Sequence, residues 1–136
     1  MGDNRIQEKK MKIKKLRIPT YGGSLWVIIS PSIKDAIERV EDMTSEQIRH
    51  KIHNGGYLGY MYSGVDERSK HRVMIFLKPN ATHGEVAHEC KHAVNIIFSY
   101  RGVKLSLTND EPECYFLDWM VTAVHRALDG YRKVSQ

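Results

Sequence analysis

Two histidines separated by three residues, with a glutamate directly after the first, form the segment best suited to chemistry. They are His88, Glu89 and His92, in the pattern H-E-x-x-H. On a helix, residues four apart lie one turn above each other, so both imidazoles can reach one ion. Neutral imidazole nitrogen is a preferred ligand of zinc. The spacing therefore predicts one zinc ion per chain, bound by His88 and His92.

Glu89 has a different position on the same helix, because it is rotated by about 100° from His88. This rotation places its carboxylate beside the ion rather than on it. There it can accept a proton from a zinc-bound water, whose acidity the metal has raised. We expect Glu89 to be the catalytic base. The alternative is that these three residues belong to the ordinary solvated surface of a helix.

A catalytic zinc ion usually has three protein ligands and one open position, so a further ligand is required. The acidic cluster Asp110, Glu111 and Glu113 follows the motif and would approach it if the chain turns back. Geometry alone does not choose between Glu111 and Glu113, and the helix dipole also favours acids in a first turn. Asp118 is a candidate for orienting a ligand imidazole. His125 lies about 21 Å beyond Glu111 along the helix, which makes it a poor ligand candidate.

Four segments have the composition of β-strands. Residues 11–18 alternate basic and apolar side chains, which indicates a strand with one face in water. Residues 24–30 are rich in β-branched and aromatic side chains and predict a buried strand. Residues 57–62 and 72–77 flank a polar turn and predict an antiparallel hairpin.

The strands are interrupted by two segments with helical patterns. Residues 32–42 carry apolar side chains along one helical stripe. Thr44 and Gln47 match the capping-box pattern and predict a second, short helix that ends before Asn54.

Two longer helices are expected in the remainder of the chain. Thr82 and Glu85 match the capping box that opens the motif helix, and Gly102 is suited to end it. The last helix is expected to begin within residues 110–112 and to continue to Gly130. Strands with short helices, followed by two long helices, predict an α+β fold.

Length and composition predict one domain over residues 11–136, preceded by a flexible polar segment, residues 1–10. No apolar run approaches the roughly 20 residues that span a bilayer, and the N-terminus does not resemble a signal peptide. We therefore expect a cytoplasmic protein with no membrane partner. Cys90 and Cys114 do not make a disulfide framework, and we expect Cys90 in the core.

The net charge of +5 arises mainly from lysines and arginine within residues 9–17. Such a run can contact phosphates, but it is more typical of a solvated tail or of a lysine-protected edge strand. Nucleic acid is therefore not the expected partner.

The motif residues together with the segment Glu111-Pro112-Glu113-Cys114-Tyr115 resemble minimal members of the gluzincin metallopeptidases. In several such families the second helix carries E-x-x-A, whose glutamate is the third zinc ligand. Glu111 to Cys114 fits this pattern with cysteine in place of alanine, so the resemblance implies that Glu111 is the third ligand, with Glu113 in reserve. The run from Asn109 into Tyr115 and Trp119 is also similar to small phage- or prophage-encoded H-E-x-x-H proteins. The resemblance covers about residues 72–125.

The resemblance implies a zincin-like fold, with a small, mainly antiparallel sheet, an active-site helix and a following glutamate helix. It implies that an edge strand of the sheet binds extended peptide, for which residues 72–77 are the candidate. Tyr115 is the first candidate to stabilise the oxyanion of the reaction, with His83 and His71 as alternatives. Large peptidases of this kind add a lower subdomain that builds specificity pockets, and we expect none in the few residues after Gly130.

Two functions follow as expectations. The first is a zinc-dependent peptidase that cleaves a protein or peptide substrate, in the host cytoplasm if the chain is phage-encoded. The second is a non-catalytic zinc-binding protein of the same fold with a binding or regulatory role.

Overall fold

The computed structural model describes residues 11–48 and 59–135. Their regular elements, in chain order, are β1 (Lys12–Arg17), β2 (Ser24–Ile29), α2 (Ile33–Thr44), β3 (Gly59–Val65), β4 (His71–Leu77), α3 (His83–Arg101) and α4 (Glu111–Ser135). Strands come first and two long helices last, which confirms the predicted α+β class. The predicted segment 1–10 lies outside the described residues.

The four strands form one sheet in the order β1-β2-β4-β3. The two outer pairs, β1 with β2 and β3 with β4, are antiparallel, whereas the central pair β2 and β4 is parallel. The sheet is therefore mixed. The predicted hairpin is confirmed, but the prediction that residues 72–77 form an edge strand is wrong. β4 is paired on both sides, and the edges among the described residues are β1 and β3.

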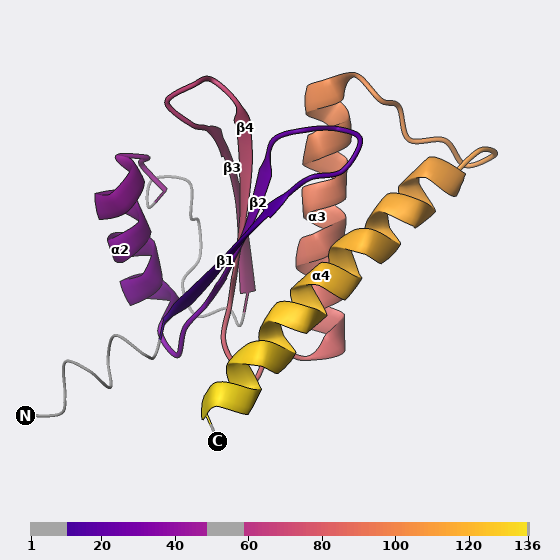
Figure 1. Cartoon of the computed structure of the whole chain (residues 1–136). Coiled ribbons are helices and arrows are strands. Elements are labelled where there is room, and N and C mark those ends of the chain that lie inside the picture. The colour runs from indigo at the N-terminus through magenta and orange to yellow at the C-terminus, as the bar shows by residue number, and fades with distance from the viewer. Residues whose placement is uncertain (1–10, 49–58, 136) are drawn as a thin grey trace, which may run out of the picture.

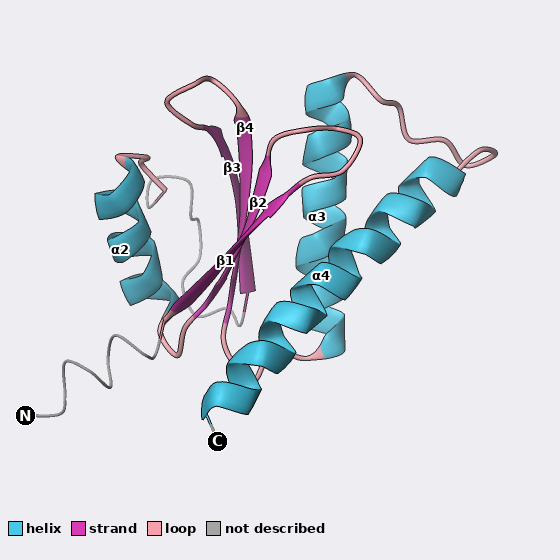
Figure 2. Cartoon of the chain, in the orientation of Figure 1, coloured by secondary structure: helices cyan, strands magenta, loops and turns pink. Residues whose placement is uncertain are grey.

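The sheet separates two layers of helix, with α2 on one face and α3 and α4 on the other (Figures 1 and 2). Alternate side chains of the central strands enter two cores because successive residues point to opposite faces. Trp26, Ile28, Met74 and Phe76 pack with α2. Leu25, Val27, Ile29, Val73, Ile75 and Leu77 pack with α3 and α4. The H-E-x-x-H motif belongs to α3 and therefore lies on the second of these faces.

The ends of α3 agree with the sequence prediction. The Thr82 side chain accepts a hydrogen bond from the backbone N–H of Glu85, and the Glu85 side chain accepts one from the backbone N–H of Thr82. At the other end, Gly102 is left-handed at φ 71°, and its N–H donates to the carbonyls of Phe98 and Ser99. These caps fix the motif in the middle of a 19-residue helix.

Two helix boundaries differ from the predictions. Thr44 is the last residue of α2, and Ser45 follows in the left-handed conformation at φ 62°, so residues 45–48 do not begin a new helix. The rest of the short helix predicted from Thr44 lies outside the described residues. α4 continues past Gly130 to Ser135. A Cβ added to Gly130 would meet nothing within 4 Å, so no neighbouring element blocks the helix from continuing through this residue.

No helix among the described residues is long and apolar enough to cross a membrane. Both cysteines are free thiols; Cys90 is buried, as expected, and Cys114 is exposed.

Candidate metal centre

The two motif histidines converge on the exposed side of α3. The Nε2 atoms of His88 and His92 are 3.2 Å apart, and the ring centroids are 4.7 Å apart at 80°. Two nitrogens bound to a tetrahedral zinc ion at 2.0–2.1 Å are separated by about 3.3 Å. The pair therefore has the spacing that zinc requires, without any change in the backbone. Both side chains are exposed, so an ion can reach them from solvent.

Glu89 lies beside this pair but is buried, with 9% of its surface exposed. It packs against the first residue of β3: a Cβ built on Gly59 would lie 3.0 Å from the Glu89 Cγ and 3.2 Å from its Oε2. The strand therefore approaches the carboxylate as closely as it does because residue 59 has no side chain. Helical rotation separates Glu89 from the histidines, and the edge strand then covers it.

Burial is the main cause of a raised pKa of Glu89, and the nearby His88 and His92 oppose the shift. Desolvation penalises the charged carboxylate, whereas a positive neighbour favours it. A carboxyl group with a raised pKa is a stronger base once it is ionised, which suits a group that accepts a proton and later returns it.

Cys90 lies between the motif histidines in sequence but faces the opposite way, into the core. Burial, with a smaller contribution from Glu89, raises the pKa of its thiol to about 12. The thiol is therefore protonated at neutral pH, whereas a metal ligand must be a thiolate. Within this motif, the two imidazoles are therefore the side chains whose chemistry suits a metal ion.

The structure does not bring Glu111 together with the two histidines. Within residues 11–48 and 59–135, no three His, Cys, Asp or Glu side chains are grouped so that they could hold one ion. Glu111 is the exposed first residue of α4. Glu113 lies nearer to α3, where its carboxylate forms an ion pair with Lys91. Residues two apart on a helix differ by about 200° in direction, so the two glutamates cannot both face α3.

The remaining predicted side chains are scattered. Tyr115 is 70% exposed on α4. Asp118, also exposed, accepts a hydrogen bond from the Thr122 hydroxyl at 3.4 Å. His71 is buried and stacks on Tyr100 with ring centroids 4.1 Å apart.

His83 and His125 form a second histidine pair, which joins the first residue of α3 to α4. His83 Nδ1 and His125 Nε2 are 3.4 Å apart. The sequence placed His125 too far along α4 to bind an ion together with the motif. The structure agrees, because His125 contacts α3 at His83, more than one helical turn before His88.

Tyr60 on β3 is a site residue that the sequence reasoning did not identify. Its pKa is raised mainly by burial and also by the negative charge of Glu89, so its phenol lies within electrostatic reach of that carboxylate. The composition of residues 57–62 and the polar turn that follows predicted a strand, but not the helix beside which the strand would lie. Only the position of β3 alongside α3 shows that Tyr60 lies near Glu89.

Comparisons with protein-family models, with curated proteins and with solved structures found no match for this chain. The similarity to gluzincins therefore depends on the motif residues.

Proposed function

We propose that this chain is a zinc-dependent metallopeptidase of the gluzincin type with a zincin-like fold. The observation that carries the proposal is the pair of Nε2 atoms 3.2 Å apart, with the buried Glu89 carboxylate beside them. His88 and His92 would hold the ion, and zinc when bound supplies an acidified water and a Lewis acid for the peptide carbonyl.

Glu89 is the proton carrier of this mechanism. It accepts a proton from the attacking water at a carboxylate oxygen and delivers it to the amine nitrogen that leaves. Its burial under Gly59 keeps bulk water from competing for that proton and limits the directions the carboxylate can take. Tyr115 and Tyr60 are the two candidates to donate a hydrogen bond to the oxyanion.

The substrate is proposed to bind as an extended strand along β3, in place of residues 72–77. β3 pairs only with β4 among the described residues, and its first residue touches Glu89. A peptide added to this edge would form main-chain hydrogen bonds with β3 and pass over the end of the strand that lies beside the catalytic base.

Glu111 remains the proposed third ligand because it matches the family pattern. The competing carboxylate of Glu113 is held by the ammonium group of Lys91, and binding a metal ion with Glu113 would require that ion pair to break. Glu111→Gln and Glu113→Gln therefore separate the two possibilities, since only the variant of the true ligand weakens zinc binding by about tenfold or more.

Metal content tests the proposal independently of activity. The chain purified from zinc-supplemented medium and desalted should contain one zinc ion, and His88→Ala/His92→Ala should contain none. The double variant His83→Ala/His125→Ala is a matched control because it removes another histidine pair with a ring-nitrogen separation of 3.4 Å. Zinc retained by the motif variant but lost by the control would refute the assignment.

Turnover is tested with Glu89→Gln, which keeps the shape of the side chain but removes its basicity. The variant should retain its zinc and lose cleavage of a generic fluorogenic protein substrate by about a hundredfold or more. Unchanged cleavage would exclude Glu89 as the base.

One observation favours the second candidate, a non-catalytic zinc protein. The described residues contain no third ligand beside His88 and His92, and a lysine already neutralises the nearer glutamate. If the wild-type chain binds zinc through the motif but cleaves no substrate in a broad peptide library, this binding or regulatory role replaces the peptidase.

A further inference from the structure

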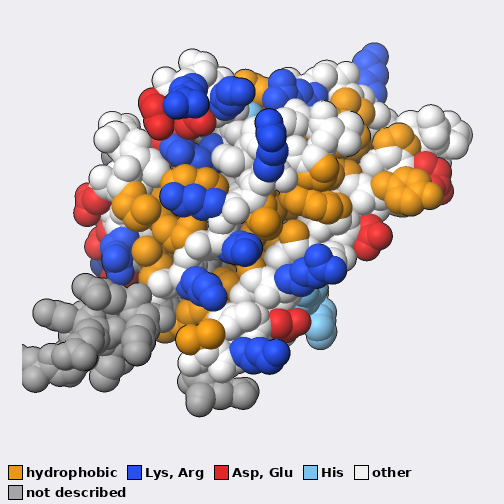
Figure 3. Space-filling model, viewed as in Figure 1, with side chains coloured by type: hydrophobic (Ala, Val, Ile, Leu, Met, Phe, Trp, Pro, Cys, Tyr) orange, Lys and Arg blue, Asp and Glu red, His pale blue; other side chains and the backbone are white. Residues whose placement is uncertain are grey.

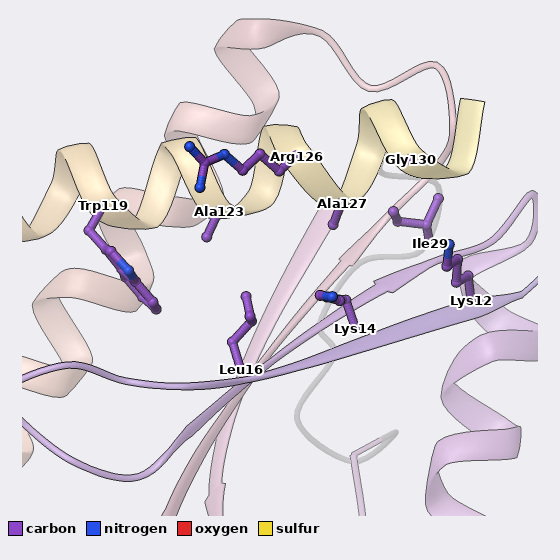
Figure 4. Close-up of a pocket in the computed structure, with 9 residues that line it drawn as sticks. All are labelled: Lys12, Lys14, Leu16, Ile29, Trp119, Ala123, Arg126, Ala127 and Gly130. Atoms are coloured by element: carbon purple, nitrogen blue, oxygen red, sulfur yellow. The ribbon is translucent and has the colours of Figure 1, made fainter. Parts of the chain in front are cut away.

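A groove runs between β1 and α4, on the same sheet face as α3 but at the opposite edge of the sheet from β3 (Figure 4). Its volume is about 420 Å³. One wall consists of residues of β1 and the other of a single stripe of α4. The lining residues are Lys12, Lys14, Leu16, Ile29, Trp119, Ala123, Arg126, Ala127 and Gly130.

The groove exists because α4 has small residues where it passes β1. Ala123, Ala127 and Gly130 are spaced at four and three residues, so they lie on one helical face. Trp119 fills the space at one end, where it stacks near Phe116. Beyond it, the small side chains leave an apolar floor that consists of the half-buried Leu16 beside the buried Ile29.

The walls of the groove are positively charged. Lys12 and Lys14 extend from β1 and Arg126 from α4, and no acidic residue lines the groove. Lys15 does not contribute, since its ammonium lies over Trp26 on the opposite face of the sheet, 4.3 Å from the ring centroid. A neighbouring hollow of about 520 Å³ continues along α4 and adds Arg132 and Lys133, with Asp129 as its one acid. Figure 3 shows basic and hydrophobic side chains interspersed over β1 and α4.

The outer edge of β1 adds a third feature. β1 pairs only with β2 among the described residues, so its other backbone groups face outward beside the groove. A strand added there would direct every second side chain to the α4 face. Alternate residues of a strand are about 6.7 Å apart, which is also the spacing of Lys12 and Lys14 along β1.

We propose that this groove binds an extended acidic segment of a partner protein, which pairs with the free edge of β1 and directs alternate carboxylates toward Lys12, Lys14 and Arg126. The methylene groups of these acidic side chains would cover Leu16 and the alanines of α4, because the intervening residues of the strand point to the opposite face of the sheet. Lysines on an edge strand repel basic strands, including β1 of a second copy, and the same charge selects an acidic one. The proposal goes beyond the peptidase function and needs neither zinc nor Glu89.

The binding test uses a fluorescent peptide of alternating glutamate and valine, measured by anisotropy at low salt. Lys12→Glu/Lys14→Glu should weaken binding by about tenfold or more, because both contacts become repulsive. Lys34→Glu/Arg39→Glu is the matched control: it makes the same charge change on exposed positions of α2, across the sheet. The control should change affinity by less than about twofold.

A second variant fills the groove without changing charge. Gly130→Leu meets no atom within 4 Å at its Cβ and removes a glycine from a helix interior, so the fold should be retained or stabilised. Peptide affinity should nevertheless fall by about fivefold or more, because the leucine side chain occupies space that the bound peptide needs.

Four results would overturn the binding of an acidic segment in this groove, and a fifth would overturn its pairing with β1. The four are no peptide binding by the wild type, equal weakening in the α2 control, undiminished binding by Gly130→Leu, and tighter binding of a single-stranded oligothymidine that displaces the peptide. The last would assign the groove to nucleic acid. Equal binding of the same peptide with alternate backbone nitrogens methylated would refute the pairing with β1.

Discussion

Gly59→Ala perturbs the proposed base without changing any group that titrates or binds metal. The new Cβ would lie 3.0 Å from the Glu89 Cγ, 3.0 Å from the Leu77 Cδ2 and 3.2 Å from the Glu89 Oε2. Carbon atoms in contact prefer about 3.5–4.0 Å, so the Glu89 side chain or the edge strand must move by about 0.5 Å.

Two opposing effects determine the size of the response. Overpacking a filled interior costs about 1–3 kcal/mol, whereas replacing a strand glycine recovers about 0.5–1 kcal/mol of backbone entropy. The free energy of unfolding should therefore fall by about 0.5–2 kcal/mol. Because a 1 Å misplacement near a reacting centre can cost about a hundredfold in rate, a shift of half that size predicts about a tenfold loss of turnover.

The assay measures thermal unfolding, zinc content and substrate turnover on the same samples. Gly84→Ala is the matched control, since its Cβ would meet only the Thr82 Oγ1, at an ordinary 3.9 Å, and α3 should be stabilised by up to about 1 kcal/mol. Gly59→Ala should retain its zinc but lose turnover, and Gly84→Ala should retain both. Equal turnover in the two variants would refute the claim that the contact between β3 and Glu89 positions the base.

Three further predictions concern the folded state. Burial, and secondarily the charge of Arg101, lowers the pKa of His71 below 6.5, so the stability contributed by His71 is complete above that pH and falls as the pH drops below it. The free energy of unfolding in urea should therefore differ less between about pH 7.5 and 5.5 for His71→Gln than for the wild type, and an equal difference would contradict this. Thr82→Ala removes the cap of α3 and should cost about 1 kcal/mol by the same measurement, whereas no loss would mean that the capping box does not stabilise the helix. In the native state a maleimide should label the exposed Cys114 and leave the buried Cys90 unmodified until unfolding, and rapid labelling of both thiols would be inconsistent with this packing.

Local signals predicted the motif helix accurately because its ends are determined by neighbouring residues. Thr82 and Glu85 cap each other across one turn, and Gly102 takes the left-handed conformation that other residues adopt only with strain. Alternation in residues 12–17 likewise indicates a strand with one face in water, and the β-branched and aromatic composition of residues 24–29 indicates a buried strand. Such features require no knowledge of the remaining chain.

The position of β3 was not predictable from the same signals. Sequence neighbours correctly suggested that β3 and β4 pair, but the parallel pairing of β2 with β4 connects strands far apart in sequence and encloses β4. Because of this long-range pairing, residues 72–77 lie inside the sheet and Gly59–Val65 forms its edge. It also brings Gly59 and Tyr60 beside Glu89, which no local pattern indicates.

The direction of the acidic cluster was likewise undetermined by sequence. Glu111 and Glu113 both suit a first helical turn, and the rotation of α4 about its axis decides which one faces α3. Packing of Phe116, Met120 and Val124 in the core sets that rotation, and the ion pair of Glu113 with Lys91 follows from it.

Zinc-edge X-ray absorption on the purified chain tests the central claim most directly, because it counts the nitrogen ligands and their distances without requiring activity. The proposed metal centre predicts two imidazole nitrogens at about 2.0 Å, and the imidazole signal should disappear in His88→Ala/His92→Ala and persist in His83→Ala/His125→Ala. A wild-type spectrum without imidazole scattering, or one that only the second variant abolishes, would contradict the assignment of the metal centre to the H-E-x-x-H motif.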